Sequence, residues 1–251
     1  MAFGSSNPRM AARTQTTAVF DEGLRAYMLR VYNYMGVALV ITGVLAYLVA
    51  QMSVVLGPTG EIVGVTQFGQ TLFNTPLKWI VMLAPLGLVM VFSFRIQKMS
   101  ASSAQMIFWA FAALMGISLS TIFIAFTTES IARVFFITAG TFGAMSLYGY
   151  TTKRSLANWG SFLFMGLIGI IIASVVNIFI GSSAIQFAIS VIGVLVFVGL
   201  TAYDTQRIKE TYSANMDSEM TTKTAIHGAL RLYLDFINLF IMLMQLFGNN
   251  R

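Results

Sequence analysis

The sequence has no cysteine among its 251 residues, and only 10% of its residues are charged. Without cysteine the chain cannot form disulfides, thiolate metal sites or a thiol nucleophile. It also has no glycine-rich phosphate loop, no His-Glu-x-x-His helix and no serine nucleophile elbow. The sequence signatures of P-loop NTPases, zinc proteases and serine hydrolases are therefore missing.

Apolar residues are abundant instead. They make up 57% of the chain, and the mean hydropathy is +0.79. Seven apolar runs, most of about 20 residues, can each cross a hydrocarbon core about 30 Å thick. The runs are residues 31–50, 77–94, 107–126, 131–150, 160–180, 184–203 and 225–247. We expect an all-α membrane protein with one seven-helix transmembrane domain (31–251), in which the longest connection, 51–76, is a flexible turn region.

The net charge of +6 reflects membrane topology rather than nucleic-acid binding, because the basic residues lie mostly at helix ends and not in one patch. Eleven lysine and arginine residues fall on the side of the N-terminus and three on the opposite side. This bias predicts a cytoplasmic N-terminus. Seven full crossings then put the C-terminus outside, unless the last segment, which charge interrupts, is re-entrant.

Residues 1–30 are expected to form a cytoplasmic tail. Its apolar residues Phe20, Leu24, Tyr27 and Met28, followed by Val31 at the start of the first apolar run, recur at helical spacing. This pattern fits an amphipathic helix on the membrane surface, and it equally fits a helical lead-in to the first span.

Two aspartates carry the strongest functional signal. Asp204 ends one apolar run, and Asp235 lies inside another. An ionisable group within a bilayer is costly and therefore marks a candidate functional site. With the predicted topology, both aspartates and Arg95, at the end of the second segment, can converge in the cytoplasmic half of the bundle.

Two neighbouring carboxylates in a low dielectric cannot both ionise cheaply, so such a pair shares a proton over part of the pH range. Together with Arg95 they could form a pH-sensitive latch. They also attract a hard cation such as Ca²⁺, although two carboxylates provide only a weak or transit site.

In the plainer alternative, Asp204 pairs with Arg207 or Lys209, and Asp235 pairs with Arg231 one helical turn away. His227, the only histidine, either tunes the site or lies on the surface.

Paired membrane aspartates are also the catalytic device of intramembrane aspartyl proteases. Tyr203-Asp204 matches one half of that signature, but Asp235 follows Tyr233-Leu234 rather than Gly-x-Gly, and the Pro-Ala-Leu element is missing. We therefore expect no enzymatic activity.

Residues 230–240 (LRLYLDFINLF) and 203–208 (YDTQRI), supported by 23–28 (GLRAYM) and 176–179 (VNIF), resemble the Bax inhibitor family. The resemblance implies a seven-helix fold whose last helix is wrapped by the other six, and a pH-sensitive calcium leak without a tightly bound cofactor. Its di-aspartyl sensor would be Asp204 and Asp235, and its latch would be Arg95. The lack of a large extra domain resembles the bacterial branch, which implies the inner membrane.

Two departures from the family pattern concern the sensor. No acidic residue stands about three turns before Arg95, and Arg231 adds a charge near the pair. Arg231 could favour the ionised pair or replace part of the latch. The bacterial branch also includes a modulator of the membrane-bound protease FtsH. The alternative function is therefore an interaction protein that engages such a protease through residues 1–30.

Overall fold

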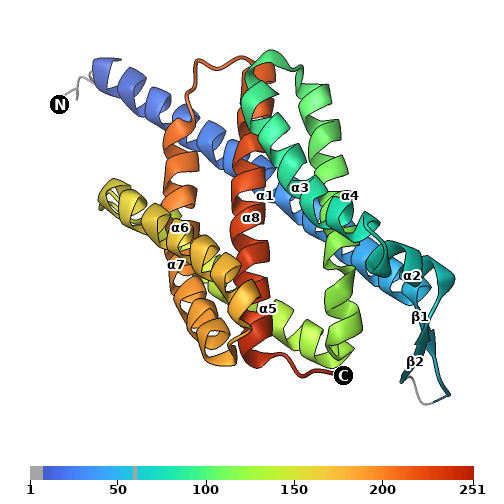
Figure 1. Ribbon diagram of the computed structural model, residues 1–251. Coiled ribbons are helices and arrows are strands. Elements are labelled where there is room, and N and C mark those ends of the chain that lie inside the picture. The colour runs from blue at the N-terminus through green and yellow to red at the C-terminus, as the bar shows by residue number, and fades with distance from the viewer. Residues whose placement is uncertain (1–7, 59–60) are drawn as a thin grey trace.

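The computed structural model describes residues 8–58 and 61–251, apart from the side chains of residues 8–20 and 97 (Figure 1). Nearly all of this chain is helical, with a short two-stranded sheet in one loop. The elements are α1 (Pro8–Ser53), β1 (Val54–Leu56), β2 (Ile62–Val65), α2 (Gln67–Asn74), α3 (Leu77–Arg95), the 3₁₀ turn η1 (Ile96–Lys98), α4 (Ala101–Ala125), α5 (Thr128–Thr151), α6 (Ala157–Ile180), α7 (Ser183–Thr211) and α8 (Ser218–Phe247).

Seven of the described helices are long and apolar enough to cross a membrane, namely α1, from Asp21 onward, and α3 to α8. Their outer surface is apolar: large side chains such as Phe179, Ile178 and Phe94 are more than three-quarters exposed. Exposing such an apolar surface to water is unfavourable, so the surface fits contact with lipid chains. The prediction of an all-α membrane protein with seven transmembrane helices is confirmed.

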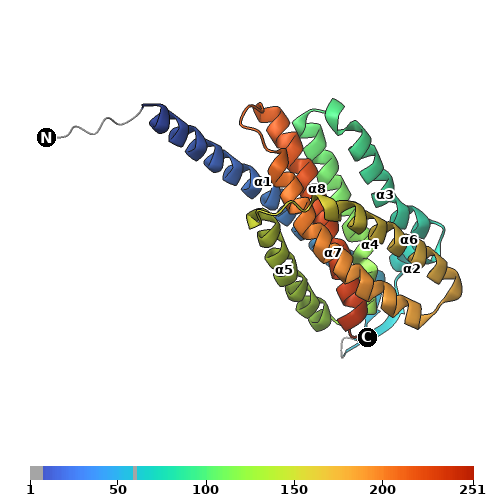
Figure 2. The same cartoon turned by 90° about the vertical axis from the view of Figure 1, so that its left-hand side faces the viewer.

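Helix α8 is the centre of the bundle. It packs against α1, α4, α5 and α7, while α3 and α6 complete the ring mainly through α4 and α7 (Figures 1 and 2). In its most apolar stretch 56% of the residues are buried, against 11% for α3. Tyr233 of α8 has no exposed surface, packs edge-on against Phe108 and Phe111, and shares a hydrogen bond with Thr42 (2.7 Å).

The first helix is continuous through residue 31, and its N-terminal part extends beyond the other helices (Figure 2). Leu24, Tyr27, Met28 and Val31 are all buried in the bundle. These residues therefore form a lead-in to the first span and not a separate surface helix. Residues 1–7 of the expected tail, and the side chain of Phe20, lie outside what the structure describes.

The connection 51–76 is more ordered than expected. β1 and β2 pair antiparallel, with Val54 opposite Val65, and α2 follows after Thr66, whose hydroxyl accepts a hydrogen bond from the backbone N–H of Gly69. Valine and isoleucine on both sides of a Gly-Pro turn favour a hairpin, and a threonine at the N-cap starts a helix. The prediction of a flexible turn region gave too much weight to the glycines.

The last helix is one unbroken helix of 30 residues, and the chain after it lies beside the α4–α5 loop. The backbone N–H of Thr127 donates to the carbonyl of Asn249, and that of Arg251 donates to Ala125. We call this the distal end of the bundle, and the end where α7 stops and α8 begins the proximal end. Because α8 starts at one end and stops at the other, it is long enough for a full crossing rather than a re-entrant segment.

Candidate functional site

Asp204 and Asp235 lie together in the proximal half of the bundle. Asp204 stands two turns before the end of α7, and Asp235 stands in the central helix α8. Asp235 is 5% exposed and the Asp204 side chain 13%. The two carboxyl groups lie close enough to influence each other's charge directly.

A hydrogen bond between the two carboxyls would require a proton. An ionised carboxylate can only accept hydrogen bonds, so two of them can be joined only if one is protonated. Consistent with this, Oδ2 of Asp235 is buried without a hydrogen-bond donor among the described residues. Burying an oxygen without a hydrogen-bond donor carries a free-energy penalty. One proton held between the two carboxyls would remove this penalty.

Arg231 supplies the positive charge at this site. Its Nη1 donates to Oδ1 of Asp204 at 3.2 Å, which makes an ion pair between α8 and α7. The Arg231 side chain is 44% exposed, so its head group reaches the proximal surface while Asp204 lies deeper. The alternatives that paired Asp204 with Arg207 or Lys209, and Asp235 with Arg231, are therefore not what the structure forms. Instead, the guanidinium of Arg207 donates to the Tyr203 hydroxyl, and Lys209 donates to the carbonyl of Tyr150.

Arg95 lies at the C-terminal end of α3, and the turn η1 that follows it packs on α8. Its side chain is exposed and makes no hydrogen bond or ion pair with any described residue. The structure therefore brings Arg231, and not Arg95, onto the carboxyl pair. The role of Arg95 as a latch stays a prediction.

The polar residues of α8 lie along one stripe of the helix. His227, Arg231, Asp235, Asn238 and Gln245 fall within less than a quarter-turn of each other at about 100° per residue. Met242 lies in the same stripe and packs against Gly193 of α7, where a Cβ would meet its sulfur. The stripe thus follows the α7–α8 interface from the proximal toward the distal end.

A polar cluster ends this stripe at its distal side. The amide of Gln186 and the hydroxyl of Ser190 both donate to Oε1 of Gln245, at 2.6 and 2.7 Å, and the Asn177 amide donates to Gln186. Three helices, α6, α7 and α8, are joined in this way. Asn238, by contrast, bonds only to the carbonyl of Leu234, four residues earlier in its own helix.

Some polar residues near the pair carried no signal in the sequence. Tyr32, Ser146 and Thr205 form a hydrogen-bonded chain beside Asp204 (2.5 and 3.0 Å) that links α1, α5 and α7. The Tyr27 hydroxyl is buried with no partner among the described residues. These residues read as ordinary helix positions because only the packing of α1 against α5, α7 and α8 brings them near the aspartates.

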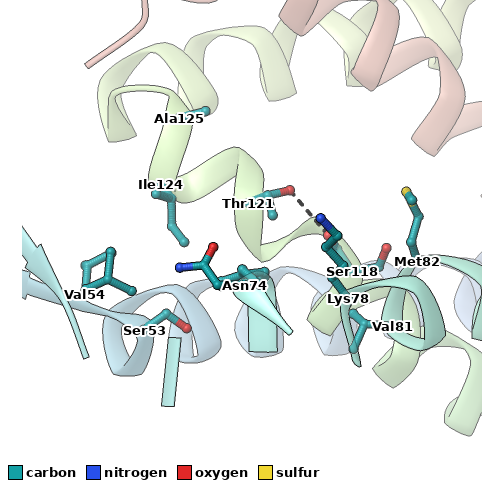
Figure 3. Close-up of a pocket in the computed structure, with 12 residues that line it drawn as sticks. Ser53, Val54, Asn74, Lys78, Val81, Met82, Ser118, Thr121, Ile124 and Ala125 are labelled. Carbon is teal, nitrogen blue, oxygen red and sulfur yellow. Dashed lines mark hydrogen bonds between the residues drawn. The ribbon is translucent and has the colours of Figure 1, made fainter. Parts of the chain in front are cut away.

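A cavity of about 460 Å³ lies at the distal end, far from the aspartates (Figure 3). Its walls are mostly apolar and come from α1 to α4 and the hairpin. Lys78, Asn74, Ser118 and Thr121 are among its few polar lining residues. No group of three or more His, Asp or Glu residues in the described chain could hold a metal ion, at this cavity or elsewhere.

The fold and this site define a class: multi-pass membrane proteins with paired carboxylates on neighbouring helices inside the bundle. Residues 24–251 match the family described as "Inhibitor of apoptosis-promoting Bax1". The chain belongs to this Bax inhibitor family, which confirms the resemblance seen in residues 230–240.

Bacterial proteins similar to this chain match it along nearly its whole length. The Uncharacterized protein RP147 of Rickettsia prowazekii is 48% identical over 238 residues, 95% of each chain. Inner membrane protein YbhL of Escherichia coli K12 is 47% identical over 232 residues, 91% of this chain and 94% of YbhL. A protein of Caulobacter vibrioides is 44% identical over 232 residues, 92% of this chain and 91% of its own. The similarity therefore applies to the whole bundle.

Proposed function

We propose that this protein is a pH-sensitive cation leak, with Ca²⁺ as the ion, in a bacterial inner membrane and with its N-terminus in the cytoplasm. The observation that carries the proposal is the buried Asp204–Asp235 pair, capped by Arg231 on its proximal side. The name of YbhL supports the inner membrane, and the distribution of Lys and Arg supports the orientation.

The gate would work through the charge of the pair. With one shared proton, the pair carries a single negative charge, which Arg231 balances, and the α7–α8 contact holds. When the proton leaves at higher pH, two negative charges face one guanidinium in a low dielectric. Their repulsion favours separation of α7 from α8, so deprotonation opens the leak and protonation closes it.

Calcium suits such a site. Ca²⁺ prefers six to eight oxygen ligands, so two carboxylates with water bind it weakly and release it again. Conduction requires an ion to bind well enough to enter and weakly enough to leave. We therefore assign Asp204 and Asp235 as a transit site, with no resident cofactor and no catalytic chemistry.

The polar stripe of α8 offers the path. From Asp235 to the amide cluster at Gln245 is ten residues, or about 15 Å along the helix. Asn238 lies between them, and Met242 against Gly193 forms the apolar step. An opening between α7 and α8 would expose this stripe to water from end to end.

The test is Ca²⁺ entry into liposomes that carry the purified, folded protein, measured against empty liposomes between pH 5 and 8. Flux that rises with pH supports the leak. An absence of flux at every pH contradicts it. The alternative role, modulation of an FtsH-type protease through residues 1–30, would then be tested by deleting the first twenty residues and following protease activity.

A further inference from the structure

A pocket of about 180 Å³ opens at the proximal end, beside the Arg231–Asp204 ion pair. We call it the basic pocket. Residues of α1, α7 and α8 line it, among them Tyr27, Arg207, Thr211, Thr224, His227 and Arg231. The lining includes two arginines and one histidine, and none of its residues is a carboxylate.

Tyr27 is a second, separate feature of the basic pocket. The residue is 2% exposed, and its ring packs against Tyr212 at 5.4 Å between centroids. Its hydroxyl is buried with no hydrogen-bond partner among the described residues. Buried polar groups in proteins are nearly always partnered, so this hydroxyl, on a residue that lines the pocket, is left in need of an acceptor.

The two arginines of the pocket have N–H donors to spare. Arg207 uses one N–H on the Tyr203 hydroxyl (3.1 Å), and Arg231 uses one on Asp204, out of five on each guanidinium. Thr211 and Thr224 already donate to carbonyls of their own helices. A ligand here would meet positive charge and N–H or O–H donors, which is the environment that an oxyanion prefers.

We propose that the basic pocket binds a small oxyanion of the phosphate class between Arg207, Arg231 and Tyr27. The bound anion shares Arg231 with Asp204, so it competes with the carboxylate for the guanidinium. It therefore weakens the ion pair that joins α8 to α7. This last consequence rests on the proposed gate, whereas the binding itself does not.

Binding is tested with inorganic phosphate added to the full-length protein in phosphate-free detergent at constant ionic strength. The readouts are ³¹P line broadening and the melting temperature. Saturable binding is expected for the wild type, with affinity about tenfold lower in Tyr27→Phe and in Arg207→Gln, because each variant removes a donor to a charged acceptor. Arg133→Gln, at the distal end, is the matched control and should bind like the wild type. Lack of saturable binding, or an equal loss of phosphate affinity in the Arg133→Gln control, contradicts the proposed oxyanion site.

The competition between the bound anion and Asp204 for Arg231 is tested separately. Asp204→Asn releases Arg231, so its phosphate affinity should rise several-fold above the wild type. An unchanged or lower affinity contradicts competition for Arg231. Both readouts are independent of Ca²⁺ flux, so failure here leaves the proposed leak standing, and absence of flux leaves the oxyanion site standing.

The same phosphate chemistry could come from a lipid headgroup or from free phosphate. Nanodiscs of phosphatidylcholine alone, compared with nanodiscs containing phosphatidylglycerol, separate the two sources. Loss of phosphate binding in the anionic nanodiscs assigns the pocket to a headgroup, and retained binding assigns it to the free ion. Either result supports an oxyanion site.

Discussion

Arg231 of α8 reaches across to Asp204 of α7, with 3.2 Å between Nη1 and Oδ1, rather than to Asp235 one turn further along its own helix. The guanidinium thus balances the shallower carboxyl, while Oδ2 of the deeper one has no hydrogen-bond partner among the described residues. The ion pair also fastens the central helix to α7 at the proximal end. One residue therefore contributes both to the charge of the pair and to the closed contact.

Arg231→Gln should move the pH midpoint of Ca²⁺ flux to higher pH by on the order of one unit, because a nearby cation favours the ionised carboxylates and its loss makes the proton harder to remove. Arg95→Gln should have a much smaller effect, since Arg95 contacts neither aspartate in this structure. Liposome flux at graded pH measures both. A larger shift in Arg95→Gln would favour Arg95 as the latch and contradict the role given to Arg231.

Tyr233→Phe should destabilise the protein by about 1 kcal/mol, because it leaves the buried Thr42 hydroxyl without the Tyr233 partner. The phenyl ring keeps the packing on Phe108 and Phe111. Thermal unfolding in detergent measures the change. Tyr47→Phe is the matched control, because Tyr47 is 45% exposed, and its stability should stay near that of the wild type.

Gly149→Ala should lower stability by about 1–3 kcal/mol, because a Cβ at this position would collide with the backbone of Ala202 and push α5 away from α7. Gly143→Ala adds the same methyl group where there is open space. It should be neutral or slightly stabilising, since alanine favours helix. Equal melting temperatures for the two variants would mean that α5 and α7 do not approach this closely.

Gln245→Leu should reduce Ca²⁺ flux several-fold at pH 8 without moving its pH midpoint. The substitution removes the amide oxygen that accepts from Gln186 and Ser190 at the distal end of the polar stripe, far from the sensor. Gln51→Leu makes the same exchange on the exposed face of α1 and should leave flux unchanged. Normal flux in Gln245→Leu would remove the distal cluster from the path.

The helices could be predicted from the sequence because each apolar run matches the thickness of a bilayer and carries few charges. The proximity of Asp204 to Asp235 followed from helix direction: α7 ends and α8 begins at one end, so residues near that connection meet. Local features were harder to predict from the sequence. The hairpin at Val54–Leu56 and Ile62–Val65 is too short to stand out among the glycines around it.

The partner of Arg231 could not be predicted, because it depends on how α7 is rotated against α8. Arg231 and Asp235 stand four residues apart, which favours a pair within the helix, and only the packing directs the guanidinium to Asp204 instead. Tyr27 was equally hidden. Its helical spacing indicated a surface helix or a lead-in to the first span, but a buried hydroxyl without a hydrogen-bond partner among the described residues is visible only in three dimensions.

The most direct test of the di-aspartyl gate is the pH dependence of Ca²⁺ flux in Asp204→Asn and Asp235→Asn beside the wild type. Asparagine keeps the size of the side chain and mimics the protonated carboxyl, so we predict low flux that no longer rises with pH, most completely for the more deeply buried Asp235. A wild-type rise with pH in both variants, with folded protein confirmed, would contradict the di-aspartyl gate.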